Sequence, residues 1–254
     1  MSVDAIPTTA MKARFDFKGA RILVTGATSG IGHAVALTLR ARGAQVYASG
    51  RDATVLDALS AAGCTTIALD LADAAAIEPA LAGLPPLDGL VNCAGVTSLE
   101  KAVDLDAAHF DFVMGVNARG AALVGRSVAR AMIAAGKRGS VVNVSSQAAL
   151  VGMDDHLSYC ASKAAMDAMT RVWCVEWGRH GIRVNSVNPT VTLTPMAEFA
   201  WSEPAKREPA LAAIPLGRFA QPSEVVEPIL FLLSDAASMI SGVTLAIDGG
   251  YTSR

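Results

Sequence analysis

The sequence predicts a single-domain α/β protein built on a doubly wound parallel sheet of about seven strands, with helices on both faces. Short segments rich in valine, isoleucine and leucine alternate with helical segments along nearly the whole chain. Strands of this composition are buried on both faces, as parallel strands are when helices cross over between them. Right-handed crossovers then place those helices on both sides of the sheet.

The predicted strands and helices follow one another in a regular order. Each strand is a short apolar run, and we expect these runs at residues 20–25, 44–49, 64–69, 87–92, 140–145, 182–187 and 244–247. We expect the helices between them at residues 31–42, 52–62, 72–82, 106–135 and 156–180. Glycine readily adopts the left-handed conformation that closes a helix, and glycines stand at four of the helix ends, namely Gly43, Gly63, Gly136 and Gly181.

No linker divides this pattern. Pro85 and Pro86 form only a turn, so we expect one domain over residues 18–254 after an N-terminal extension at residues 1–17. Residues 195–216 interrupt the alternation near the end of the chain. Insertions of this kind are often lids over an active site, and we expect a substrate lid here.

Composition limits the class of protein. The chain has 254 residues, of which 52% are hydrophobic, and a formal net charge of −2. This charge balance argues against a nucleic-acid partner, which usually meets a basic surface, and no apolar run is long enough to span a membrane. The four cysteines lack the spacing of a metal site, and the N-terminus lacks the apolar core of a secretory signal. We expect no metal, no nucleic acid, no membrane partner and a cytoplasmic location.

A glycine-rich turn follows the first predicted strand, with the sequence TGATSGIG at residues 25–32. Glycines allow a tight turn and let the backbone approach a pyrophosphate, and the helix that follows offers its unpaired N–H groups to the phosphates. An ordinary strand–helix turn is the alternative. The strand before these residues and the helix after them favour a nucleotide site.

The end of the second strand bears on the choice of nucleotide. NAD sites usually place an acidic residue there, which accepts a hydrogen bond from the ribose 2′-hydroxyl. This chain has Arg51 instead, whose guanidinium can bind a 2′-phosphate. A surface pair between Arg51 and Asp52 is the alternative. The sequence favours NADP(H), and use of NAD(H) remains open.

Tyr159 and Lys163 lie four residues apart in a predicted helix, so they share one face. A lysine ammonium beside a phenol stabilises the phenolate, and such a tyrosine can exchange a proton with a substrate. Ser146 follows a strand and can hydrogen-bond a substrate carbonyl. Asn117 stands inside a helical pattern, where asparagine is unfavourable. Alone, the tyrosine–lysine spacing is common in helices, and Asn117 could be a surface residue.

Several motifs together resemble the short-chain dehydrogenase/reductase family, and they occur in the family's order. Within the family, the run NSVNPTVTLT (185–194) is most similar to the L-xylulose (dicarbonyl) reductase branch. Two positions depart from the family pattern: Cys93 stands where asparagine is common, and Thr190 stands where glycine is usual. The matching motifs are TGATSGIG (25–32), DL (70–71), NCAG (92–95), VNARG (116–120), VNVSS (142–146), YCASK (159–163), RVNSVNPT (183–190) and DGG (248–250).

The resemblance implies a Rossmann-like oxidoreductase and a set of site residues. Many NADP-preferring members carry lysine or arginine at the position of Ser29, so the expected preference depends on Arg51. The implied catalytic tetrad is Asn117, Ser146, Tyr159 and Lys163. Expected substrate contacts, some from position in the chain, are Ser146, Gln147, His156, Tyr159 and Trp201. Expected cofactor contacts are Gly26, Thr28, Ser29, Gly30, Ile31, Gly32, Arg51, Asp70, Leu71, Asn92, Ala94, Gly95, Tyr159, Lys163, Pro189, Val191 and Thr194.

Three functional hypotheses follow. The leading one is an NADP(H)-dependent carbonyl reductase or alcohol dehydrogenase that acts on a small ketose, polyol or dicarbonyl. A 3-oxoacyl-carrier-protein reductase is the first alternative, and it would need a basic face for an acidic carrier. A cofactor-binding redox sensor is the second. The family also implies a homotetramer or homodimer, with residues 228–250 pairing across a two-fold axis.

Overall fold

The computed structural model describes residues 15–194, 197 and 201–253. Strands lie where the apolar runs predict them, with small differences at their ends. They are β1 (Arg21–Val24), β2 (Gln45–Gly50), β3 (Thr65–Ala68), β4 (Gly89–Asn92), β5 (Gly139–Val144), β6 (Ile182–Pro189) and β7 (Thr244–Ile247). The α-helices are α1 (Gly30–Ala41), α2 (Ala53–Ala61), α3 (Ala74–Leu81), α4 (Ala107–Met114), α5 (Ala121–Ala134), α6 (Leu157–Gly178), α8 (Pro204–Ala212) and α9 (Pro222–Leu233).

Within these residues, seven parallel strands form one sheet in the order β3-β2-β1-β4-β5-β6-β7. The chain first winds outward from β1 to β3, then returns to β4 and winds outward in the other direction to β7. The doubly wound parallel fold predicted from the sequence is therefore confirmed. The change of direction between β1 and β4 leaves a crevice at the carboxyl ends of these strands, which is where such sheets bind ligands.

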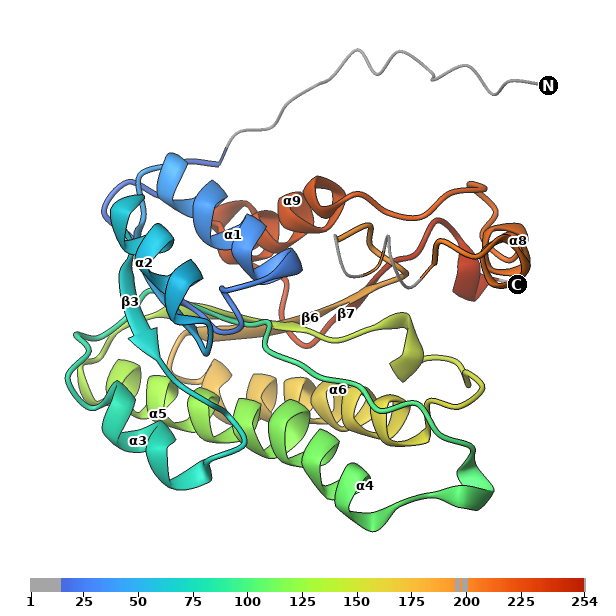
Figure 1. The fold of residues 1–254 in the computed structure, drawn as a ribbon. Coiled ribbons are helices and arrows are strands. Elements are labelled where there is room, and N and C mark those ends of the chain that lie inside the picture. Colours follow the sequence, from blue (N-terminus) through green and yellow to red (C-terminus); the bar gives the residue numbers. More distant parts are fainter. Residues whose placement is uncertain (1–14, 195–196, 198–200, 254) are drawn as a thin grey trace.

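Two layers of helices cover the sheet (Figure 1). Helices α1, α2 and α9 lie on one face, over a core that includes Ile22, Leu39 and Ile229. Helices α3, α4, α5 and α6 lie on the other, over a core that includes Leu90 and Met132. In the part of the chain that the structure describes, no helix is long and apolar enough to cross a membrane.

Aspartate side chains begin several helices. The carboxylates of Asp52, Asp73 and Asp106 accept hydrogen bonds from N–H groups in the first turns of α2, α3 and α4. Such caps satisfy donors that the helix itself leaves unpaired. The Asp52 carboxylate thus faces the first turn of α2. Its neighbour Arg51 forms its ion pair with Asp70.

The helix predicted over residues 106–135 is interrupted. A π-helical segment, Gly115–Gly120, joins α4 to α5. Gly120 packs so closely on Leu71 that an added Cβ would lie 2.8 Å from the Leu71 Cβ. Segments of this kind occur often at functional sites. Here the segment carries Asn117, whose side chain is completely buried.

The chain joins the domain earlier than predicted. Phe17 is buried in the core, and the ring of Phe15 lies 6.0 Å from that of Phe231 in α9. Of the extension expected at residues 1–17, Phe15 and Phe17 thus pack on the domain, while Asp16 between them is exposed. Residues 1–14 lie outside the described part of the chain.

Candidate active site

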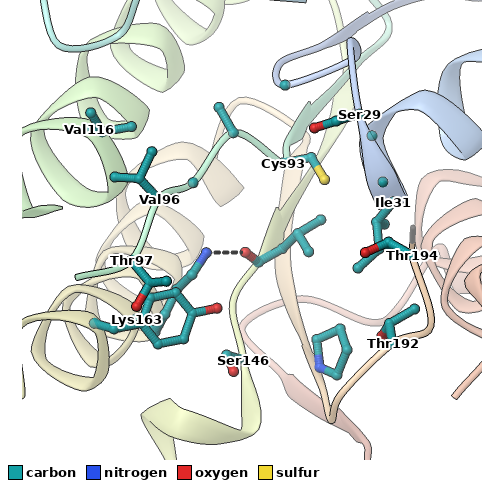
Figure 2. A pocket seen from close by; sticks show the side chains of 18 of the residues that line it. Ser29, Ile31, Cys93, Val96, Thr97, Val116, Ser146, Lys163, Thr192 and Thr194 are labelled. Carbon is teal, nitrogen blue, oxygen red and sulfur yellow. Dashed lines mark hydrogen bonds between the residues drawn. The ribbon is translucent and has the colours of Figure 1, made fainter. Parts of the chain in front are cut away.

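The carboxyl ends of the strands meet at one edge of the sheet, where a cavity of about 690 Å³ opens. This volume is typical of small-molecule and cofactor sites. Residues that follow β1, β2, β4, β5 and β6 line the cavity, together with the first turns of α6. Figure 2 shows Ser29 and Ile31 across the cavity from Lys163 and Ser146.

The glycine-rich turn forms one end of the cavity, and it has no room for a side chain at Gly26 or at Gly32. Gly26 has a φ of +66°, and an added Cβ would lie 2.7 Å from the Ala94 Cα. A Cβ on Gly32 would lie 2.3 Å from the Gly26 carbonyl oxygen. The Thr25 Oγ1 holds the two strand ends together, because it accepts hydrogen bonds from the N–H groups of Cys93 and Ala94 at 3.0 and 3.2 Å.

The first turn of α1 opens into the same cavity. Gly30, Ile31 and Gly32 line it, and among the described residues the Ser29 side chain finds no capping partner in this helix. Unpaired N–H groups at a helix N-terminus bind phosphate. An open first turn beside a glycine floor that any Cβ would fill fits the pyrophosphate of a dinucleotide.

Arg51 and Asp70 lie where β2 and β3 end. The Arg51 Nη1 is 3.6 Å from the Asp70 Oδ2, and the two side chains are 58% and 45% exposed. Among the described residues Arg51 pairs with Asp70 and not with Asp52, whose carboxylate caps α2 instead. An exposed ion pair of this length is weak, so the guanidinium can turn to another anion. NAD sites usually have an acidic residue at this strand end. In this chain such a side chain in place of Gly50 would collide with Thr28, because an added Cβ would lie 2.4 Å from the Thr28 Cγ2.

Tyr159, Lys163 and Ser146 line one region of the cavity. The buried Lys163 Nζ donates to the Val144 carbonyl oxygen at 2.8 Å, as Figure 2 shows, and lies 5.7 Å from the centre of the Tyr159 ring. The Ser146 Oγ accepts a hydrogen bond from the Ala148 N–H at 3.1 Å. The serine hydroxyl proton therefore remains to be donated, and this group of side chains can supply a proton and a hydrogen bond to a single substrate oxygen.

Asn117 lies behind Lys163 and outside the cavity lining. Its Oδ1 accepts from the Val96 N–H at 2.8 Å, and its Nδ2 donates to the Val96 carbonyl at 2.8 Å and to the Ser162 Oγ at 2.9 Å. An added Cβ on Gly95 would lie 3.4 Å from both the Asn117 Oδ1 and the Lys163 Nζ. Asn117 thus fixes the loop after β4 against α6, and its burial excludes the surface alternative.

Three further side chains that the sequence predicted as substrate contacts line the same cavity. The His156 ring stands edge-on to the Tyr159 ring, with centroids 6.2 Å apart. Gln147 is buried, and its Oε1 has no hydrogen-bond partner among the described residues. Trp201 packs edge-on against Phe219, with centroids 5.4 Å apart. The imidazole, amide and indole groups together suit a small molecule that carries both hydroxyl groups and an apolar face.

Cys93 turns its sulfur toward the cavity (Figure 2). Burial raises the pKa of this thiol to about 11, although the Lys163 ammonium acts in the opposite direction. The thiol is therefore neutral at physiological pH, and a neutral thiol is a poor nucleophile. We assign Cys93 a packing role in the cavity wall.

The structure brings most of the predicted site residues together. Two of them, Asn92 and Asn117, do not line the cavity. The Asn92 Nδ2 instead donates to the Asn143 Oδ1 at 2.9 Å inside the sheet. Of the predicted lid, residues 195–196 and 198–200 lie outside the described residues. The predicted residues that line the cavity are Gly26, Thr28, Ser29, Gly30, Ile31, Gly32, Arg51, Asp70, Leu71, Ala94, Gly95, Ser146, Gln147, His156, Tyr159, Lys163, Pro189, Val191, Thr194 and Trp201.

Other residues line the cavity without having been predicted as contacts. Thr190 and Thr192 lie within three residues of the end of β6, and Val96 and Thr97 within five residues of the end of β4. Their position after a strand end is a signal that the sequence already carries. Met153 also lines the cavity, but no motif or strand end near it in the sequence predicts a place in the site.

Known proteins resemble this chain over almost its full length. The family model described as Enoyl-(Acyl carrier protein) reductase matches residues 26–252. An L-xylulose reductase from Bos taurus is 48% identical over 235 residues, which are 92% of this chain and 96% of the relative. A D-erythrulose reductase from Gallus gallus is 44% identical over 95% of this chain and 99% of its own length. A D-threitol dehydrogenase from Mycolicibacterium smegmatis is 41% identical over 94% and 95%.

Solved structures agree with the fold. A short chain dehydrogenase/reductase family protein has a TM-score of 0.87 and 37% identity, covering 93% of this chain and 99% of that one. A structure described as a 2-deoxy-d-gluconate 3-dehydrogenase from Agrobacterium tumefaciens, with bound NADP, has a TM-score of 0.87 and 31% identity over 96% and 100%. The fold and the cavity define a nicotinamide-dependent oxidoreductase. The chain belongs to the short-chain dehydrogenase/reductase family.

Proposed function

We propose that the protein is an NADP(H)-dependent oxidoreductase that interconverts a small ketose or dicarbonyl and the corresponding alcohol. The observation that carries this proposal is the meeting of Tyr159, Lys163 and Ser146 in one cavity with the glycine floor. The similarity to an L-xylulose reductase, a D-erythrulose reductase and a D-threitol dehydrogenase supports a polyhydroxylated substrate.

In this proposal Tyr159 gives its hydroxyl proton to the substrate oxygen when a carbonyl is reduced, and takes it back in the reverse direction. Ser146 donates its free hydroxyl proton as a hydrogen bond to the same oxygen. Lys163 stabilises the phenolate that forms on Tyr159 and binds the nicotinamide ribose. Asn117, beside Lys163, supports the waters that return a proton to the site. When bound, the nicotinamide supplies or accepts the hydride.

The cofactor is held by three parts of the cavity in this proposal. The turn from Gly26 to Gly32 binds the pyrophosphate through backbone N–H groups. Arg51 binds the 2′-phosphate, and Val191 and Thr194 contact the nicotinamide end. Pro189 and the remaining predicted contacts close the walls.

The substrate lies against Gln147, His156 and Trp201 in this proposal. Gln147 supplies a polar group that the fold leaves without a partner among the described residues, and Trp201 covers an apolar face of the substrate. Residues 201–216, including α8, act as a cover within a single functional domain over residues 18–254. We place this domain in the cytoplasm, where its four free thiols would stay reduced.

Replacing Arg51 with alanine is expected to remove the preference for NADPH. The guanidinium can form a charge-assisted hydrogen bond to a 2′-phosphate, worth about 1.5–3 kcal/mol, so NADPH should be preferred about tenfold to a hundredfold in the wild type. The lower end is expected, because Arg51 is more than half exposed and shares its charge with Asp70. The variant should have a higher Michaelis constant for NADPH and an almost unchanged one for NADH.

Steady-state kinetics with both cofactors measure this preference. Arg130→Ala is the matched control, since Arg130 is an exposed arginine on α5, paired with Glu78 and remote from the cavity. Equal or better efficiency with NADH in the wild type would show that Arg51 is only a surface charge.

A substrate panel tests the proposed function itself. Purified protein is incubated with NADPH and, in separate reactions, with L-xylulose, D-erythrulose, simple α-dicarbonyls and 3-oxoacyl thioesters. Ketoses or dicarbonyls should be reduced with the highest kcat/KM. A clear preference for acyl thioesters would favour the carrier-protein reductase alternative, and cofactor binding without turnover of any class would favour a sensor.

We propose that four copies assemble as a dimer of dimers. β7 is an edge strand, and near it Met239, Val243 and Leu245 are exposed. An edge strand presents unpaired backbone groups that can pair with another chain, and exposed apolar side chains beside it favour such a contact. Light scattering at micromolar concentration should give the mass of a tetramer, and a stable monomer would contradict this arrangement.

A further inference from the structure

A layer of buried polar side chains separates α6 from the sheet behind the proposed active site. Asp167 is 3% exposed, and Thr170, Asn143, Ser186 and Asn188 are fully buried. Polar groups at such depth destabilise a fold unless each finds a partner with good geometry. Their contacts are therefore specific, and they form two separate links between α6 and the strands.

The first link begins at Asp167. This residue lies on the same stripe of α6 as Tyr159 and Lys163, at successive intervals of four residues. Its Oδ1 accepts a hydrogen bond from the Ser186 Oγ at 2.8 Å, and its Oδ2 accepts one from the Asn188 Nδ2 at 2.8 Å. The carboxylate thus uses both oxygens to hold β6.

Asn188 continues this link to the loop after β5. Its Nδ2 also donates to the backbone carbonyl oxygen of Ser146, at 3.0 Å. The Asn188 Oδ1 lies 3.4 Å from the Ser186 Oγ, so the orientation of the amide is set from both sides. Both N–H groups of the amide are used, one on α6 and one on the residue whose hydroxyl lines the cavity.

We propose that Asp167 and Asn188 are positioning residues that hold the Ser146 hydroxyl at a fixed place relative to the Tyr159 hydroxyl. The proposal rests on the proposed function, because only that function gives Ser146 and Tyr159 a shared substrate oxygen. Asp167 and Asn188 themselves are not among the residues that line the cavity. Without Asn188, the peptide that carries Ser146 would keep its local contact to the Ala149 N–H but lose its tie to α6. The serine hydroxyl and the phenol would then no longer be fixed relative to each other.

The second link between α6 and the sheet serves as a control. It shows how far the loss of a buried link lowers stability without moving Ser146. The Asn143 Nδ2 donates to the Thr170 Oγ1 at 2.8 Å, so it also joins α6 to the sheet through fully buried groups. It ends inside the sheet, on Asn92 of β4, and makes no contact with Ser146. Loss of either link should destabilise the fold, but only loss of the first should disturb the reaction.

The test compares Asn188→Ala with Thr170→Val in the full-length protein. Thermal unfolding measures stability, NADPH fluorescence titration counts the folded sites, and kcat is expressed per site. We expect both variants to lose stability. Only Asn188→Ala should lose kcat, by about tenfold to a hundredfold as expected for a misplaced reacting group, with its affinity for NADPH retained.

A second pair of variants covers the case in which Asn188→Ala does not fold. Asp167→Ala removes the acceptor for Asn188 and should lower kcat per site. Asp167→Asn should restore kcat, because its amide oxygen can accept from Asn188 and its amide nitrogen can donate to the Ser186 oxygen.

Three outcomes overturn the proposal: wild-type kcat per site in Asn188→Ala or Asp167→Ala, an equal loss in Thr170→Val, or an equal loss in Asp167→Asn and Asp167→Ala. Tyr159→Phe, assayed on the same substrate, distinguishes its failure from failure of the proposed function. If Tyr159→Phe abolishes turnover while Asn188→Ala does not lower it, the positioning role alone is wrong. If Tyr159→Phe retains near-normal turnover, the proposed function has the wrong proton donor, and a link that positions Ser146 relative to Tyr159 has no catalytic role to serve.

Discussion

Turnover by the Tyr159→Phe variant is expected to fall by about 10²- to 10⁴-fold, the range that a single general acid contributes. The substitution removes one hydroxyl group and keeps the ring, so the edge-on contact with His156 and the position of α6 should persist. The variant should keep its cofactor binding, because the glycine turn and Lys163 are untouched and only one hydroxyl of the expected contacts is lost. The loss should therefore appear in kcat.

Steady-state kinetics and NADPH titration measure these two quantities in the same preparation. Tyr47→Phe is the matched control, since Tyr47 lies on β2 and is not among the cavity residues. Its turnover should equal that of the wild type. Near-normal turnover by Tyr159→Phe would show that the proton comes from another group.

Gly32→Ala is expected to abolish tight cofactor binding. The new Cβ would lie 2.3 Å from the Gly26 carbonyl oxygen and 2.8 Å from its carbonyl carbon. These are backbone atoms, so the whole turn must shift, and overpacking of this kind costs about 1–3 kcal/mol. The shift would displace the N–H groups that we propose bind the pyrophosphate. The dissociation constant for NADPH should rise by at least about tenfold, and the melting temperature should fall.

Gly178→Ala is the control for this substitution. Gly178 ends α6, has an ordinary φ, and has no atom within 4 Å of an added Cβ in the described structure. Alanine should be neutral or slightly stabilising there. Calorimetry and fluorescence titration should separate the two variants. A Gly32→Ala protein that binds NADPH as the wild type does would mean that the turn is not the pyrophosphate site.

The alternation of apolar strands and helices was sufficient to predict the sheet, because burial on both faces leaves a strong mark on composition. The glycine turn was predictable for a similar reason, since only glycine fits where Gly26 meets Ala94. The break in the helix over residues 106–135 was not predictable. A π-helical segment needs only one extra residue in a turn, and the helical periodicity around Asn117 is too short to reveal it.

The polar layer between α6 and the sheet was also not predictable from the sequence. Asp167 and Asn188 stand on different elements, and nothing in their local sequence shows that they meet. Their pairing depends on how α6 lies across β6, which is a property of the packed structure. Asn92 shows the converse: its place at a strand end predicted a cofactor contact, but its side chain is taken up by Asn143 in the neighbouring strand.

The order of strands also has a consequence for how the chain folds. All neighbouring strands in the described sheet are parallel, so no pair can form as a local hairpin. β1 pairs with β4 through contacts such as Ile22 with Gly89, and during synthesis this side of β1 must wait until β4 has left the ribosome. Contacts so distant in sequence form slowly, because the loop must close before they contribute stability. The close contact between Gly26 and Ala94 does not exist before that closure, so the growing chain acquires its proposed dinucleotide site only when its two halves join.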